Sequence, residues 1–68
     1  MKVKDILKQV NDPMLYILIK KKDKEHGMFK KNDPLLVYNN SLKNSTIKKI
    51  NSQYKEGKRI LILEVKGW

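Results

Sequence analysis

Lysine is the residue type in this sequence with the clearest chemical potential. The chain carries 16 lysines and arginines against 7 acidic residues, and its formal net charge is +9. On a small body this charge produces a positive field that attracts polyanions such as RNA, DNA or an acidic protein surface. We expect such a partner to contact the basic residues Lys20, Lys21, Lys22, Lys24, Lys30, Lys31, Lys48, Lys49, Lys55, Lys58 and Arg59.

A second interpretation of the lysine excess is compositional. Arg59 is the single arginine, alanine is absent, and asparagine and isoleucine are common. AT-rich codons favour Lys, Asn and Ile, so part of the charge reflects coding bias and ordinary solvated surface. Base-specific recognition is not expected, because it relies on Arg, Asn and Gln presented by an element that enters a groove.

Catalytic signatures are not found in the sequence. It contains no nucleophile elbow, no phosphate-binding Walker loop and no G-x-G-x-x-G motif. His26 lies near Asp23 and Glu25, residue types that serve in metal or acid–base sites, but in a charged loop we expect solvated side chains. With no cysteine and one histidine, neither a disulfide nor a zinc site is expected. We therefore predict a non-enzyme with no cofactor, no metal and no small-molecule substrate.

Aromatic side chains are the next candidates. Tyr16 and Tyr38 fall in strand-like segments, where rings could stack on single-stranded bases, but core packing is the interpretation that we favour. Tyr54 is assigned to the core as well. Trp68 either seals the end of the sheet or serves as an exposed contact residue.

The elements that position these residues follow from hydrophobic spacing. The i, i+3, i+4, i+7 pattern of a helix face occurs at Val3, Ile6, Leu7 and Val10. Pro13 ends this helix. The apolar run 14–19 predicts a strand that is apolar on both faces, and it is too short to cross a membrane as a helix. The charged segment 20–27 predicts a loop or hairpin tip.

The second half of the chain predicts a helix between two strands. Residues 28–29 begin a return strand, and residues 35–38 resume it after Asn32-Asp33-Pro34. That triplet repeats Asn11-Asp12-Pro13, a turn device in which an Asx side chain caps the turn. Residues 39–41 are expected to form a loop. A helix is expected from about residue 45 to 56, with Ile47, Ile50 and Tyr54 on its apolar face, and Gly57 suits the position after its end. The alternation over residues 59–66 predicts the last strand.

These elements predict an α+β fold with a single domain over residues 1–68. The order is α-β-β-α-β, with two helices and a mostly antiparallel three-stranded sheet of order 2-1-3, in which the last strand runs parallel to the second. Both sheet faces need cover, so the chain is a monomer if the two helices suffice and a homodimer if they do not. We expect no membrane association and a cytoplasmic location, because the N-terminus lacks the apolar core of a signal peptide.

The opening Met1-Lys2-Val3-Lys4-Asp5-Ile6-Leu7, a short helix leading into an apolar strand, resembles the start of many small proteins encoded by phages and other mobile elements of low-GC Gram-positive bacteria. The resemblance implies that host-directed roles are open to the chain. Two hypotheses follow. The first is a nucleic-acid-binding protein that uses lysine-rich hairpin and helix surfaces. The alternative is an inhibitor or adaptor that binds a host or defence protein.

Overall fold

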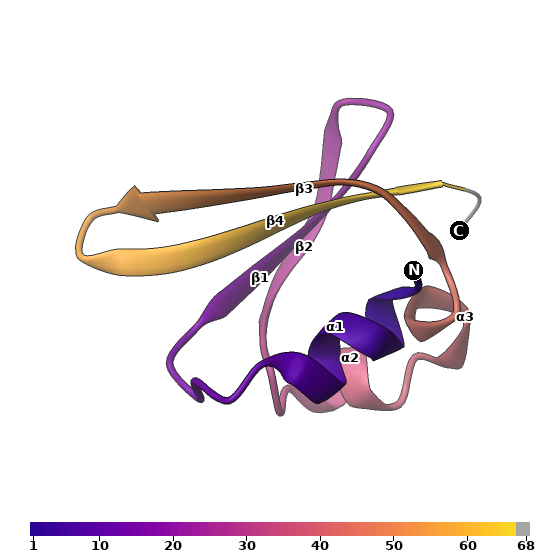
Figure 1. Ribbon diagram of the computed structural model, residues 1–68, viewed down its shortest axis with the longest axis horizontal. Helices are drawn as coiled ribbons and strands as arrows, with labels where there is room; N and C mark the ends of the chain where they lie inside the picture. The colour runs from indigo at the N-terminus through magenta and orange to yellow at the C-terminus, as the bar shows by residue number, and fades with distance from the viewer. Residues whose placement is uncertain (67–68) are drawn as a thin grey trace.

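The two most apolar segments of the chain form the centre of a sheet. The computed structural model describes residues 1–66. In it, β1 (Tyr16–Lys21) and β4 (Lys58–Lys66) run parallel to each other. β2 (Lys24–Lys30) pairs antiparallel with β1, and β3 (Thr46–Lys55) pairs antiparallel with β4, which gives a four-stranded sheet of order β2-β1-β4-β3 (Figure 1).

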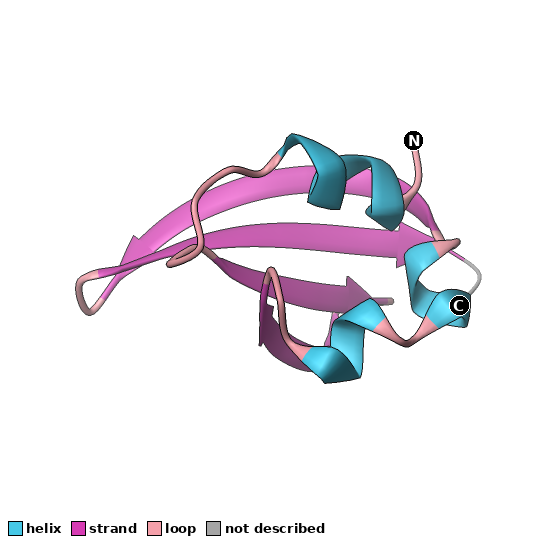
Figure 2. Cartoon of the chain, turned by 90° about the horizontal axis from the view of Figure 1, so that it is seen from below, coloured by secondary structure: helices cyan, strands magenta, loops and turns pink. Residues whose placement is uncertain are grey.

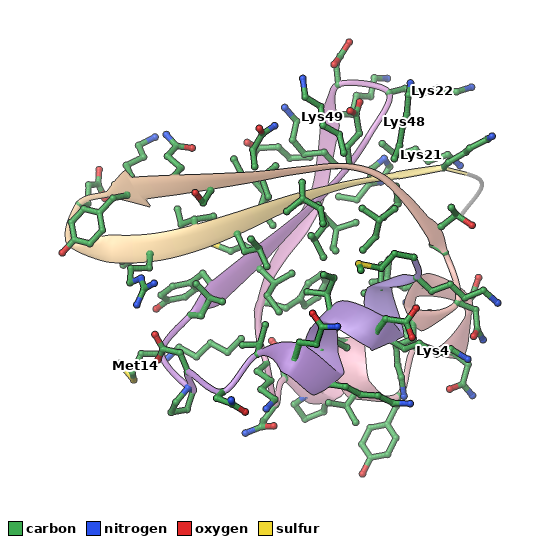
Figure 3. The ribbon with its side chains drawn as sticks, viewed as in Figure 1. Lys4, Met14, Lys21, Lys22, Lys48 and Lys49 are labelled. Atoms are coloured by element: carbon green, nitrogen blue, oxygen red, sulfur yellow. The ribbon has the colours of Figure 1, made fainter. Side chains whose placement is uncertain are left out.

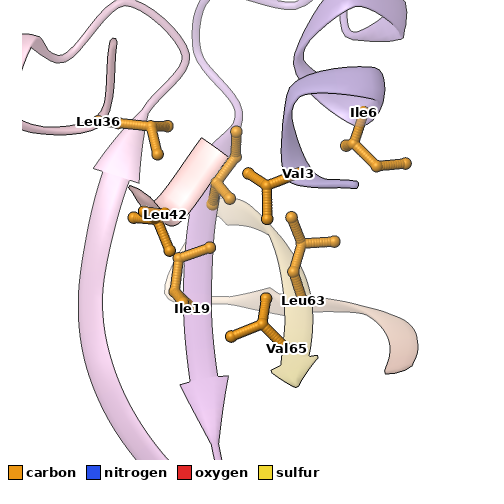
Figure 4. Packing of buried hydrophobic residues seen from close by; sticks show 8 residues of the cluster. Val3, Ile6, Ile19, Leu36, Leu42, Leu63 and Val65 are labelled. Atoms are coloured by element: carbon orange, nitrogen blue, oxygen red, sulfur yellow. The ribbon is translucent and has the colours of Figure 1, made fainter. Parts of the chain in front are cut away.

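Three short helices pack on one face of this sheet (Figure 2). α1 (Val3–Gln9) precedes β1, whereas α2 (Pro34–Val37) and α3 (Asn40–Lys43) connect β2 to β3. Apolar side chains from the helices meet those of the two central strands in a single core (Figure 4). Its buried members are Val3, Ile6, Ile17, Ile19, Leu36, Leu42, Leu63 and Val65. The predicted amphipathic helix near the N-terminus is therefore confirmed.

The α+β class is confirmed. The sheet differs from the prediction in having one more strand and in the direction of its last strand. The expected order 2-1-3 is present as β2-β1-β4, with β3 added at the edge. The last strand runs parallel to the first strand and not to the second. The crossover through α2 and α3 does return the chain parallel to β2, but it delivers β3, and the β3–β4 hairpin then reverses the direction once more.

The predicted helix over residues 45–56 is wrong, because this segment is β3. A β-bulge between Ile47 and Lys49 shifts the register of β3 against β4, so that Ile47 pairs with Val65 and Ile50 with Leu63. The bulge puts Ile47 and Ile50 on the same face although they are three residues apart, and that spacing imitates a helix. Tyr54 is not a core residue, since it lies near the hairpin tip with its side chain 72% exposed.

The predicted strand 35–38 and loop 39–41 are wrong as well, because two capped helical turns occupy this stretch. The Asp33 carboxylate accepts a hydrogen bond from Leu35 N at 2.9 Å, and Pro34 takes the first helical position of α2, which a proline ring favours. The Asn39 side chain caps α3 in the same way through Leu42 N at 3.0 Å. Tyr38 ends α2 and is 81% exposed, so it packs in neither a strand nor the core.

The opposite sheet face is not covered by a helix among the described residues. Leu18 and Ile60 lie on it and are buried, whereas Met28, the partner of Leu18 across the hairpin, is 46% exposed. The prediction that the first strand is apolar on both faces is thus confirmed. None of the helices within residues 1–66 has the length and apolar character needed to cross a membrane. The alternatives for Trp68 concern a residue outside the described range.

Candidate nucleic-acid interface

A tight turn projects the first lysine cluster from one end of the sheet. Lys22 and Asp23 alone form the connection between β1 and β2, with positive φ angles of 51° and 64°. Paired positive angles of this kind give the turn the twist that a two-residue hairpin loop requires. The predicted hairpin tip in the charged segment 20–27 is therefore confirmed, but its turn is shorter than that segment. Lys20 and Lys21 belong to β1, and Lys24 begins β2.

The bulge in β3 places Lys48 beside this turn. Residues from β1, its turn, β3 and the end of β4 surround a hollow of about 150 Å³. It is lined by Lys21, Lys22, Lys48, Glu64, Val65 and Lys66. Figure 3 shows Lys21, Lys22 and Lys48 gathered beside the β1–β2 turn, with Lys49 next to them. We refer to the four lysines Lys21, Lys22, Lys48 and Lys66 around this hollow as the basic cleft.

The charges next to the basic cleft alternate in sign across the sheet. Lys20 of β1 pairs with Glu25 on one side and with Glu64 on the other, and Glu64 in turn pairs with Lys49 of β3. Cross-strand neighbours of opposite charge stabilise a sheet by about 0.2–1 kcal/mol each. Glu64 also lines the hollow, so its carboxylate offsets part of the positive charge of the cleft. Lys22, Lys48 and Lys66 are exposed and Lys21 is half-buried.

Two more of the predicted contact residues pack against the aromatic ring of Tyr16. The ammonium groups of Lys30 and Lys58 lie 5.4 and 5.3 Å from the centroid of the Tyr16 ring, within the range of cation–π attraction. Tyr16 sits on the sheet face opposite the helices, half-buried and outside the hydrophobic core. The prediction that Tyr16 packs in the core is therefore wrong. The ring on which a base would stack is instead in contact with two lysine side chains.

The remaining predicted residues lie apart from the basic cleft. Lys55 and Lys58 face each other at the β3–β4 tip, which Figure 1 shows far from the β1–β2 turn. Arg59 follows them and forms an ion pair of 3.5 Å with Asp12. Lys31 is half-buried at the end of β2, and its ammonium donates a hydrogen bond to the Val10 carbonyl. Lys48, Lys49 and Lys55 stand on a strand, so the expected lysine-lined helix face is wrong.

Sequence reasoning missed Lys66, which lies at the cleft. It closes the last strand, and its proximity to Lys48 depends on the β3–β4 pairing, which the helix assignment of residues 45–56 concealed. His26 is exposed on β2. Within residues 1–66, no three His, Cys, Asp or Glu side chains gather closely enough to hold a metal ion.

Comparisons of the chain with models of known protein families, with curated proteins and with solved structures find no match. The site is therefore interpreted from its own geometry and charge.

Proposed function

We propose that this protein binds the phosphate backbone of a nucleic acid without catalysis, and that the basic cleft is the contact. The observation that carries the proposal is the convergence of four lysines from three strands and one turn around a single hollow. Lysine ammonium groups bind phosphate oxygens as point charges, and displacement of condensed counterions from the nucleic acid favours the complex.

Binding through this cleft does not depend on base sequence. Arg59 is the chain's single arginine, and it is paired with Asp12 near the opposite hairpin tip. The described helices have 7, 4 and 4 residues, so none is a long element that could place side chains along a major groove. Contacts to phosphate position a protein on nucleic acid but carry no sequence information directly.

Salt-dependent binding of fluorescent oligonucleotides of random sequence tests the proposal. If each of the four lysines takes up one phosphate, the log–log slope of affinity against salt is about −3.6 for duplex and about −2.8 for a single strand. Affinity then falls about 150-fold and about 50-fold, respectively, between about 50 and 200 mM salt. No binding to either form at low salt would overturn the proposal.

A pair of charge-matched variants locates the contact. Lys22→Glu/Lys48→Glu removes two cleft lysines, so the duplex slope should drop to about −1.8. Lys4→Glu/Lys8→Glu makes the same change of net charge on α1, which Figure 3 shows away from the cleft through Lys4. The slope of this second variant should stay near that of the wild type. An equal reduction of the slope in both variants would mean that the whole positive surface binds nucleic acid, which contradicts a localised site.

A further inference from the structure

A second basic site lies on the helical side of the molecule and differs from the cleft in its chemistry. A groove of about 290 Å³ runs between α1 and the α2–α3 segment. It is lined by Lys4, Leu7, Lys8, Lys31, Val37 and Lys43. Four lysines therefore surround two aliphatic side chains, and no acidic residue takes part in the lining. We refer to this feature as the helix groove.

The lysines of the helix groove are arranged on two sides of an apolar floor. Lys4 and Lys8 are four residues apart on α1, so they lie on the same helix face with their backbones about 6 Å apart along the axis. On the other side, Lys31 and Lys43 are half-buried, and each is held in place by a backbone carbonyl, that of Val10 and that of Val37.

Those two carbonyl contacts leave the charge of the groove uncompensated. A carbonyl is neutral, and an ammonium group has three N–H donors, so Lys31 and Lys43 keep both their positive charge and further donors. Half-buried ammonium groups held at fixed positions are suited to receive carboxylates, because little side-chain freedom remains to be lost on binding.

The helix α2, which supplies Val37 to the groove, also carries exposed apolar surface. The side chains of Leu35 and Tyr38 are 73% and 81% exposed, on the same short helix as Val37. Clustered exposed apolar residues are typical of protein interaction surfaces. A nucleic-acid backbone would satisfy the lysines but would leave Leu7 and Val37 without an apolar partner.

We propose that the helix groove docks an acidic amphipathic helix of a partner protein, which presents Asp or Glu together with leucine-like side chains on one face. Carboxylates four residues apart on such a helix are spaced by about 6 Å and match Lys4 and Lys8, and leucines three and seven residues after the first carboxylate lie on the same face. A groove this small and open encloses a small molecule poorly, whereas a helix of a partner protein covers both the apolar floor and the lysines of the groove. A second copy of this chain is disfavoured by its own net charge of +9.

The docking proposal is tested by NMR titration of the ¹⁵N-labelled protein with a capped helical peptide that carries Glu at positions i and i+4 and Leu at positions i+3 and i+7. Amide shifts should be concentrated at Leu7, Val37 and Lys43. Replacement of every Glu by Gln, or of every Leu by Ala, should weaken binding at least tenfold, because each change removes one of the two required chemistries. Absence of shifts up to millimolar peptide, or equal binding of all three peptides, would overturn the proposal.

The same two double variants distinguish this site from the cleft. Lys4→Glu/Lys8→Glu should weaken peptide binding at least tenfold, whereas Lys22→Glu/Lys48→Glu should leave it within about twofold. Dispersed spectra of both variants establish that each is folded. If the cleft variant loses peptide binding and the groove variant retains it, the peptide is bound by the nucleic-acid site, and the helix groove has no docking role. Failure of oligonucleotide binding alone would leave the groove result unaffected.

Discussion

The ammonium group of Lys31 donates a hydrogen bond to the backbone carbonyl of Val10 and so ties the end of β2 to the end of α1. Val10 is the C-cap residue of α1, where carbonyl groups lack intrahelical partners and the helix dipole favours a positive charge. A residue that sequence analysis assigned to ligand contact therefore also supports the packing of the first helix on the sheet.

Lys31→Met is expected to destabilise the protein by about 1 kcal/mol, because it keeps the aliphatic stem but leaves the Val10 carbonyl without this partner. In a domain of this size that corresponds to a fall in Tm of about 4–8 °C. Thermal unfolding followed by circular dichroism measures the change. The matched control Lys24→Met alters an exposed lysine near the β1–β2 turn and should change stability by less than about 0.5 kcal/mol. Equal effects of the two substitutions would contradict the structural role of Lys31.

Asp5, at the N-terminus of α1, should make the stability of the protein depend on pH. The pKa of Asp5 is lowered, first by the hydrogen bond from the Lys2 backbone N–H at 2.9 Å and then by the nearby charges of Lys4 and Lys8. A carboxyl group with a lowered folded-state pKa stabilises the protein above its unfolded pKa of about 3.9, and this contribution disappears as pH falls through the folded-state pKa.

The difference in Tm between the wild type and Asp5→Asn should therefore be constant from about pH 5 to 7 and should shrink below about pH 4. Thermal melts across this range measure it. Glu56→Gln, in the exposed β3–β4 turn, is the control and should show no comparable trend. A difference between wild type and Asp5→Asn that grows in acid would have the wrong sign for this mechanism.

The sequence predicted an element correctly where the spacing of its apolar residues fits only one kind of secondary structure. The prediction was wrong where a helix and a strand produce the same spacing. The helix ending before Pro13 and the two strands at the sheet centre follow from patterns that admit one interpretation. Ile47 and Ile50 are three residues apart, which both a helix turn and a bulged strand produce. Glu56 and Gly57, with φ angles of 54° and 75°, form a hairpin turn, but Gly57 suits the end of a helix equally well.

The candidate site was predictable only in part, for the same reason. Lys21 and Lys22 are neighbours in sequence, so their clustering needed no knowledge of the fold. Lys48 and Lys66 join them through pairing of the second hairpin with the first strand. The helix groove was not predicted at all. Lys4 and Lys8 belong to the predicted helix α1, but Val37 and Lys43 belong to α2 and α3, which were not expected from the sequence.

Replacement of glycine by alanine should lower the free energy of unfolding by different amounts at Gly57 and Gly27. Gly57 has φ of 75° and open space around the position that a Cβ would take, so Gly57→Ala should cost about 1 kcal/mol from backbone conformation alone. Gly27 has φ of 155°, and a Cβ there would lie 2.7 Å from Cζ of Phe29. The Phe29 ring must then move, so Gly27→Ala should cost about 2–3 kcal/mol.

Urea denaturation compares these two glycine substitutions. In a Phe29→Leu background the excess cost of Gly27→Ala over Gly57→Ala should shrink, because the obstructing ring is gone. An unchanged excess would show that the cost at Gly27 is conformational and does not come from the aromatic contact.

Removal of an acid beside the basic cleft should strengthen binding of nucleic acid. Glu64 lines the hollow together with the four lysines, so its carboxylate repels a bound phosphate. Glu64→Gln is expected to raise the affinity for an oligonucleotide about threefold at low salt, which is the effect of one charge about 7 Å away in a medium close to water. The same change should cost less than about 1 kcal/mol of stability, since it also removes the cross-strand partner of Lys20 and Lys49.

Glu25→Gln is the matched control for this effect, because it makes the same change of charge in the same row of alternating charges but outside the lining of the hollow. Its effect on affinity should stay below about 1.5-fold. Fluorescence anisotropy at one low salt concentration compares the two variants with the wild type. Equal gains would indicate that only net charge matters, and weaker binding by Glu64→Gln would mean that Glu64 holds the cleft lysines in their binding positions. Either result would contradict the assignment of Glu64 as a repulsive neighbour of the bound phosphate.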